Sequence, residues 1–121
     1  MPGINYEQRQ IFKASVKFSD NTGVKKRPIL VISNNKHNQI NQDLICCPIS
    51  SKNSLHGRMI YPKDYEVEGK KLPVAQSEVK SHLPFFIHKN QLILPQAGRI
   101  KLKKDFVNKI TQDIKDILEK S

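Results

Sequence analysis

Residues 27–33 read Arg-Pro-Ile-Leu-Val-Ile-Ser, and this short run decides the expected fold class. Its four consecutive aliphatic residues, three of them β-branched, are typical of a strand that is buried on both faces. Proline lacks the N–H that a sheet ladder requires, so Pro28 suits the first position of such a strand. We therefore expect a central strand over residues 28–33, preceded by a basic loop.

Further strands are expected on either side of this central strand. Residues 10–18 alternate polar and apolar side chains, the period-two pattern of a half-buried strand. The polar, Asn-rich segment 34–42 has the composition of a short helical turn, and residues 43–49 form a second apolar run. We expect this run to be a strand, with the chain leaving the sheet at Ser50.

The second half of the chain is less regular until its end. Residues 57–71 are expected to form a hairpin or a pair of short strands, and residues 72–80 a further strand. An irregular apolar turn is expected at residues 82–87 and a short closing strand at residues 96–100. From Lys103 onward, apolar residues recur at three- and four-residue steps, which indicates one amphipathic helix. The pattern predicts a mainly β, α+β fold: a strongly bent antiparallel sheet or partly open barrel with a helix over it.

Size and charge narrow the class of partner. The chain has 121 residues and a mass of 13.9 kDa, which predicts a single domain over residues 1–121. Its 21 Lys and Arg residues outnumber 11 Asp and Glu residues, so the net charge is +10 and the pI is near 9.8. Such a surface attracts polyanions, with nucleic acid first and an anionic membrane or acidic protein after it.

The sequence argues against membrane spans, disulfides and metal sites. No apolar run approaches the ~20 residues of a membrane helix and the N-terminus has no hydrophobic signal core, so we expect a cytoplasmic protein. Cys46 and Cys47 are adjacent, and neighbouring side chains on a strand point to opposite faces. Because no CxxC pair or Cys/His cluster is present, we expect a reducing compartment, no metal and no cofactor.

Three motif blocks follow one another along the chain: KKRPILVIS at residues 25–33, CCPISS at 46–51 and SEVKS at 77–81. They resemble the Arg-Pro-x-Leu-Val-Leu/Ile-Ser, Cys-Pro-Ile-Thr-Ser and Asp-Gln-Val-Lys-Ser segments of the PemK/MazF family of toxin endoribonucleases. AGRI at residues 97–100 and the terminal helix follow at the expected distance, so the resemblance runs from Gln10 to the end. It implies an SH3-like barrel, a symmetric homodimer, metal-independent cleavage of single-stranded RNA, and a cognate antitoxin whose flexible tail occupies the RNA groove.

The resemblance also implies two catalytic positions. The arginine of the family's Arg-Pro motif and the threonine of its Pro-Ile-Thr motif map onto Arg27 and Ser50. Serine keeps the hydroxyl but lacks the methyl group that stiffens threonine. The family often carries a Gly-Asp pair before the first strand, where this chain has Arg9 and Gln10, and an acidic residue ahead of the arginine, for which Asp20 is available.

Metal-free RNA cleavage uses the substrate's own 2′-OH as nucleophile. The protein must take up its proton, stabilise the anionic phosphorus and protonate the leaving 5′-oxygen. Arg27 suits charge stabilisation, with proton donation as a second role, because its fork of donors matches phosphate oxygens. Ser50 can donate to a non-bridging oxygen. The remaining acid or base is left open among Asp20, His56 and Glu78, with His37 and His82 as further titratable residues.

Five residues are predicted to bind RNA: Lys25, Lys26, Ser51, Arg58 and Lys80. The lysines offer sequence-independent attraction to the phosphate backbone, although lysines at a sheet edge also serve simply to prevent aggregation. His56 and Arg58 follow Ser50 on a loop that the family places at the rim of its RNA groove.

Two other functions are compatible with the same residues. One is a non-catalytic protein on the same fold, either an RNA-binding protein or a gyrase inhibitor similar to the CcdB toxin, which shares this barrel. The other is a basic interaction module that binds acidic protein or nucleic acid structurally.

Overall fold

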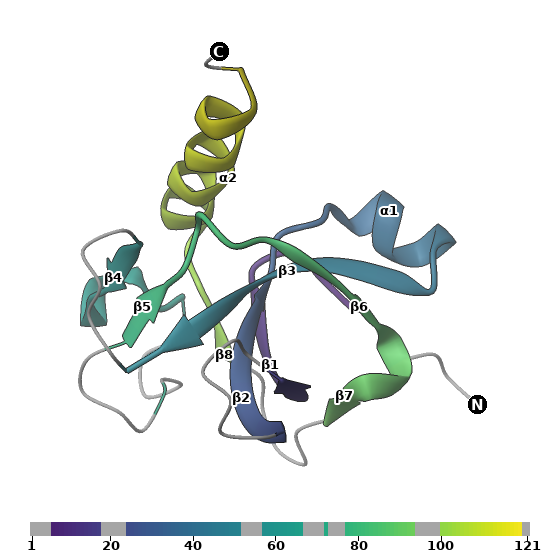
Figure 1. Ribbon diagram of the computed structural model, residues 1–121. Helices are drawn as coiled ribbons and strands as arrows, with labels where there is room; N and C mark the ends of the chain where they lie inside the picture. Colours follow the sequence, from purple (N-terminus) through teal and green to yellow (C-terminus); the bar gives the residue numbers. More distant parts are fainter. Residues whose placement is uncertain are drawn as a thin grey trace.

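The computed structural model describes residues 6–17, 24–51, 57–66, 72, 77–93 and 100–119. Figure 1 labels its elements, which in chain order are β1 (Gln10–Lys17), β2 (Val24–Val31), α1 (Asn35–Ile40), β3 (Asp43–Ser50), β4 (Arg58–Ile60), the 3₁₀ turn η1 (Pro62–Asp64), β5 (Ser77–Val79), β6 (Phe85–His88), the 3₁₀ turn η2 (Lys89–Gln91), β7 (Leu92–Ile93), β8 (Ile100–Lys101) and α2 (Lys104–Glu119).

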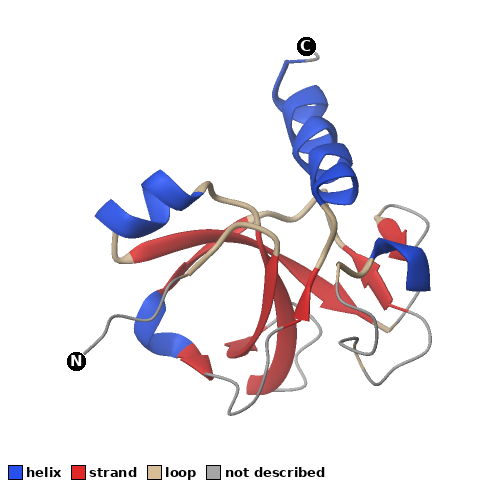
Figure 2. Cartoon of the chain, turned by 180° about the vertical axis from the view of Figure 1, so that it is seen from behind, coloured by secondary structure: helices blue, strands red, loops and turns tan. Residues whose placement is uncertain are grey.

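The strands form one curled antiparallel sheet. Its order is β4-β5-β3-β2-β1-β7, with β6 also paired to β3 and β8 also paired to β1. The sheet curls into a partly open barrel, and α2 begins against the barrel and projects away from it (Figures 1 and 2). The predicted α+β class, a partly open barrel with a C-terminal amphipathic helix, is confirmed.

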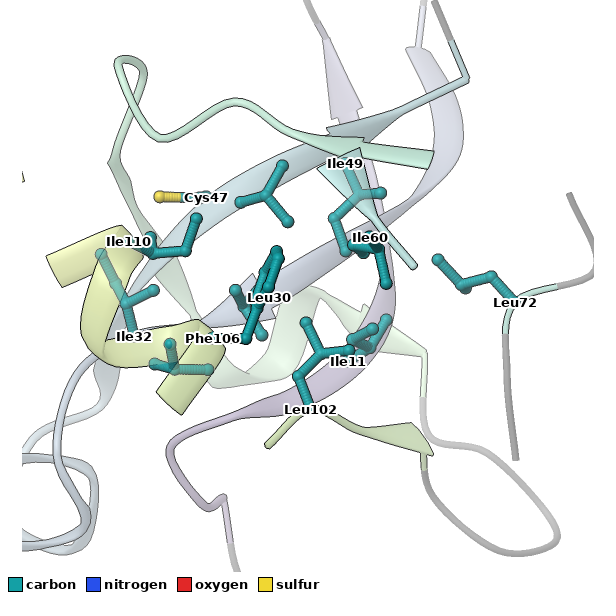
Figure 3. Packing of buried hydrophobic residues seen from close by; sticks show 12 residues of the cluster. Ile11, Leu30, Ile32, Cys47, Ile49, Ile60, Leu72, Leu102, Phe106 and Ile110 are labelled. Carbon is teal, nitrogen blue, oxygen red and sulfur yellow. The ribbon is translucent and has the colours of Figure 1, made fainter. Parts of the chain in front are cut away.

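The central position of β2 explains its continuous apolar sequence. Ile29, Leu30 and Val31 are fully buried between β1 and β3. Alternate side chains enter two different clusters: Leu30 packs with the buried residues of α2, whereas Ile29 and Val31 pack on the opposite face of the sheet. Figure 3 shows the first cluster, in which Leu30 lies beside Phe106. Burial on both faces, predicted from the run at residues 28–33, is therefore confirmed. The predicted bounds are wrong, because the strand begins at Val24 and ends at Val31, so the basic residues expected in a loop before Pro28 belong to the strand.

Several other predicted elements are confirmed. A short helix, α1, lies within residues 34–42, and its Asn34 cap accepts a hydrogen bond from the backbone N–H of His37 at 2.8 Å. Strand β3 covers residues 43–49, and α2 begins close to the expected residue. Cys46 and Cys47 are both buried free thiols, and burial raises the pKa of Cys47 to about 12.

The irregular turn predicted over residues 82–87 is confirmed for residues 82–84 and wrong for residues 85–87, which belong to β6. Phe85 pairs with Cys46 and Ile87 pairs with Leu44, both in β3. The segment is therefore a strand because β3 provides its hydrogen-bonding partners, which cannot be predicted from the local sequence. Buried and exposed side chains do alternate in this strand, since Ile87 is 2% exposed and Phe86 is 68% exposed. The strand is short and follows Pro84, so the alternation is difficult to recognise in the sequence.

The segment around β4 and β5 also differs from expectation. Strand β4 pairs with β5, and η1 follows β4, so residues 57–66 contain no second strand of a local hairpin. Within the predicted strand 72–80, Ser77–Val79 is the part that forms a strand, while residues 73–76 lie outside the described ranges. Ser50 still belongs to β3, so the predicted exit from the sheet comes too early. The closing strand is Ile100–Lys101, and residues 96–99 are likewise not among those described.

Arg9 has a positive φ of 83°, a conformation that glycine adopts readily and other residues rarely do. The family that the sequence motifs resemble often has a glycine at this position, the first residue of its Gly-Asp pair. The turn is held by backbone hydrogen bonds from Arg9 N to Val31 O and from Leu102 N to Arg9 O, at 2.8 and 2.9 Å. The Arg9 side chain adds an ion pair with Glu66 at 3.3 Å.

Helix α2 is tied to the sheet by Asp113. The carboxylate accepts two hydrogen bonds from Arg58 of β4, at 2.6 and 2.8 Å, and a third from the Ser81 hydroxyl at 3.1 Å. The bonds from Arg58 lower the pKa of Asp113 below its ordinary value, against the opposing effect of partial burial. A bidentate Arg–carboxylate pair fixes orientation as well as charge, so it sets where the helix lies.

We expect Asp113→Asn to destabilise the protein by about 1 kcal/mol at neutral pH, a modest effect because Arg58 is 40% exposed. The pKa of Asp113 is lower in the folded state. The contribution of the pair is therefore complete above the unfolded pKa of about 4 and is lost as the pH falls through the folded value. Urea unfolding at neutral pH and near pH 3 measures this. The difference in free energy of unfolding between Asp113→Asn and wild type should become smaller at low pH. The control Asp116→Asn, on the same helix, should have the same free energy of unfolding as wild type.

Candidate functional site

Arg27 and Ser50 come from neighbouring strands and share one face of the sheet. Strands β2 and β3 are antiparallel, with Ile29 paired to Pro48. The ladder ends at this pair; continued by two residues on each strand, the same register would set Arg27 opposite Ser50. Because side chains alternate along a strand, both lie on the face that carries the side chains of Ile29 and Pro48. Two residues that are 23 positions apart in the sequence are thus brought to one place by strand pairing.

Glu78 continues this row on the next strand. Ser50 of β3 is paired directly with Glu78 of β5, and Glu78 is paired in turn with Met59 of β4. Arg27, Ser50 and Glu78 therefore follow one another across β2, β3 and β5. Adjacent strands are about 4.8 Å apart, so the row spans about 10 Å. The row places a fork of donors, a hydroxyl and a carboxylate on one face.

The charged groups of this row are largely withdrawn from solvent. Glu78 is 2% exposed, and its carboxylate forms an ion pair with the ammonium group of Lys80, whose side chain is 14% exposed. The Nε atom of Arg27 is buried. Lys80 is anchored by its backbone N–H, which donates to the carbonyl of Pro48 at 2.8 Å. Electrostatic interactions are stronger in such a partly dry environment than in water.

The other predicted residues are distributed differently. Lys26 and Ser51 are exposed, next to Arg27 and Ser50 respectively. Asp20, His56 and the side chain of Lys25 lie outside the described residues, so their predicted roles stay predictions.

The guanidinium of Arg58 is bound in bidentate fashion to Asp113, which raises the pKa of Arg58. This contact gives Arg58 a structural role that the sequence did not suggest. Its predicted RNA contact stays a prediction.

Two of the three candidate histidines, His37 and His82, are among the described residues. The His37 ring nitrogen Nε2 lies 3.1 Å from the carbonyl of Asp43, the first residue of β3. Ser50 is the last residue of that strand, and at about 3.3 Å per residue the two ends are roughly 23 Å apart. His37 is therefore not brought to the Arg27–Ser50 row. His82 follows β5, and its Nδ1 atom is buried.

A pocket of about 420 Å³ lies between β4, η1 and α2. Its wall carries both signs of charge together with aromatic side chains, from Gly57, Arg58, Met59, Tyr61, Lys63, Asp64, Glu78, Phe106 and Lys109. The pocket shares Glu78 with the row described above, so the row and the pocket meet at β5. Its glycine is in close contact with β5: a side chain at Gly57 would begin 2.2 Å from the carbonyl oxygen of Val79.

Two features of the site could not be found by pattern alone. The Glu78–Lys80 ion pair has a weak local signal, since residues two apart on a strand share a face. Asp113 gives no signal as the partner of Arg58, because 55 residues separate the two. In the part of the chain that the structure describes, no three His, Cys, Asp or Glu residues gather as a possible metal site. Among the same residues, no helix is long and apolar enough to cross a membrane.

Comparison with known proteins gives a consistent result. The family model described as PemK-like, MazF-like toxin of type II toxin-antitoxin system matches residues 7–118. A solved endoribonuclease in complex with its cognate antitoxin, from a mycobacterial species, is 17% identical with a TM-score of 0.64, covering 94% of this chain and 93% of that chain. A chain of MazE-MazF (Form-III) from Deinococcus radiodurans is 16% identical with a TM-score of 0.66, covering 98% and 100%.

A further mycobacterial endoribonuclease is 15% identical with a TM-score of 0.62, covering 98% of this chain and 95% of its own. Identities this low show a shared fold, whereas the family match extends over nearly the whole sequence. A search among curated proteins finds no match.

Proposed function

Because the chain belongs to the PemK-like, MazF-like toxins of type II toxin–antitoxin systems, we propose that it is a metal-independent endoribonuclease that cleaves single-stranded RNA. The observation that carries this proposal is the row of Arg27, Ser50 and Glu78 on one face of three neighbouring strands. A phosphate laid across the row meets a guanidinium and a hydroxyl at once. The net charge of +10 supports attraction of an RNA strand, and the proposed substrate places the action in the cytoplasm.

In the proposed reaction, the 2′-oxygen of the substrate attacks phosphorus while the 5′-oxygen leaves. Arg27 donates to the non-bridging oxygens and stabilises the charge that accumulates in the transition state. Ser50 donates a second hydrogen bond from the adjacent strand. The 2′-OH proton goes to a base, for which Asp20, His56 and Glu78 are the candidates, and a proton reaches the leaving oxygen from an acid. The products are a 2′,3′-cyclic phosphate and a 5′-OH end.

An RNA digest with analysis of the ends tests this proposal. The purified protein should cleave single-stranded RNA in the presence of EDTA, and the fragments should carry a 2′,3′-cyclic phosphate or 3′-phosphate with a 5′-OH. If varied single-stranded RNAs remain intact over a range of pH values, the proposal is wrong. A 3′-OH with a 5′-phosphate would exclude attack by the 2′-oxygen.

Ser50 should contribute less than Arg27 to this reaction. We expect Ser50→Ala to lower kcat by about a hundredfold, because one neutral donor is lost from the transition state. Ser50→Thr should keep or raise kcat, since the added methyl group restricts the rotation of the hydroxyl. Both effects are read from cleavage of a quenched fluorescent RNA. Unchanged kcat in Ser50→Ala would remove the hydroxyl from the mechanism.

The proposal includes a homodimer and a cognate antitoxin. Ile117 and Leu118 at the end of α2 are 55% and 78% exposed, and they extend the apolar side of a helix whose first turns are buried. Clustered apolar side chains on a surface mark interaction sites, which supports coverage by a second copy. The basic surface suits an acidic antitoxin tail. Light scattering of the isolated protein measures whether it forms the homodimer.

A further inference from the structure

The Glu78–Lys80 ion pair is an unusual feature for a strand as short as β5. All three residues of β5 are buried, and its Glu78 carboxylate is 2% exposed. Removing a carboxylate and an ammonium from water costs free energy that apolar side chains of similar volume would not cost. A buried ion pair is therefore weak evidence for stability. The position of the ion pair beside the proposed site suggests a role in function.

Strand pairing places the Lys80 ammonium beside the proposed site. Glu78 is paired with Ser50, and the backbone N–H of Lys80 donates to Pro48, two residues before Ser50. On the other side of β3, the β2 register, continued two residues past its last pair, would set Arg27 opposite Ser50. Ser50 thus lies between Arg27 of β2 and Lys80, which follows the last residue of β5. Lys80 lies one residue beyond the end of β5, and the ion pair brings its ammonium group to the Glu78 carboxylate.

We propose that Glu78 is a positioning residue, which holds the Lys80 ammonium toward the phosphate bound by Arg27 and Ser50. Lys80 is then a second transition-state cation, and a more specific group than a general contact to the RNA backbone. This inference rests on the proposed ribonuclease function. Glu78 is buried and bonded to Lys80, so it orients the cation and leaves removal of the 2′-OH proton to another group. A lysine side chain is otherwise a flexible point charge, and the buried carboxylate supplies its orientation.

Kinetics of matched variants test this role. Glu78→Gln keeps the size of the side chain and removes its charge, and Lys80→Met keeps the length and removes the ammonium. Each should lower kcat about a hundredfold and change KM by less than about threefold, since the cation acts in the transition state. The double variant should be no worse than either single variant, because both disrupt one unit. Lys13→Met, on the exposed side of β1, is the control and should match wild type.

Two kinetic results would overturn the inference. If Lys80→Met raises KM and leaves kcat unchanged, Lys80 is an ordinary contact to the RNA backbone. RNA binding by this variant would then also depend less on salt than binding by wild type. A lower melting temperature with unchanged kcat per folded molecule would make the pair purely structural. Thermal unfolding of each variant is therefore measured beside its kinetics.

A second readout does not depend on cleavage. In protein with isotope-labelled lysine, the Lys80 ammonium signal is identified by its loss in Lys80→Met. It should shift when a single-stranded DNA oligonucleotide, which lacks the 2′-OH, is added to wild type, and should not shift in folded Glu78→Gln. If wild type responds but cleaves no RNA, the ribonuclease proposal fails and the positioned cation stands. If wild type cleaves RNA and the signal is unmoved, the inference about Glu78 fails alone.

Discussion

We expect Arg27→Ala to leave the protein folded and to lower the rate of RNA cleavage by about three orders of magnitude or more. A single donor to a developing oxyanion is worth about a hundred- to a thousandfold in kcat. Arginine presents a fork of donors and a full charge, so its loss should exceed that of one hydroxyl. RNA binding should weaken much less, because many other cations contribute to it. Single-turnover cleavage and filter binding on the same RNA separate the two effects.

Arg27→Lys is the matched variant for this experiment. It keeps the positive charge but loses the planar fork, so we expect it to recover only a small part of the rate. Thermal unfolding of both variants checks the fold, since the Nε atom of Arg27 is buried. Toxicity that persists in cells expressing Arg27→Ala would contradict the ribonuclease mechanism. It would favour a non-nucleolytic action on the same barrel, such as gyrase inhibition.

Gly57→Ala should destabilise the fold by about 3 kcal/mol, the upper end of the usual cost of overpacking. The new methyl group would begin 2.2 Å from the carbonyl oxygen of Val79 and 2.9 Å from the Cγ of Glu78. The first of these is backbone, so it cannot rotate away, and β4 would have to separate from β5. Equilibrium unfolding in urea gives the change in free energy of unfolding.

Lys63→Ala is the control for Gly57→Ala. Lys63 is exposed in η1 and lines the same pocket, and its replacement should change the free energy of unfolding by less than about 0.5 kcal/mol. Because the methyl group at position 57 also meets Glu78, RNA cleavage should fall in Gly57→Ala even where the protein remains folded. Wild-type stability in Gly57→Ala would show that β4 and β5 can separate at little cost.

Part of this protein could be predicted from local sequence. The unbroken aliphatic run of β2 specifies a strand buried on both faces, and the three- and four-residue spacing in α2 specifies an amphipathic helix. Both patterns depend on residues close together in the chain, whose burial repeats with the period of the element. The motif blocks around Arg27 and Ser50 likewise indicated the family, which the family match confirms, whereas the catalytic roles of these two residues stay predictions.

Tertiary structure decided the features that depend on partners far apart in the chain. Residues 85–88 are a strand because β3 offers them a ladder, and Arg58 is held by Asp113, 55 residues away. The ion pair of Glu78 with Lys80 acquires its place beside Ser50 only through the pairing of β3 with β5. Periodicity reports how often a side chain is buried. Which side chains meet is set by the register between strands, which no local pattern contains.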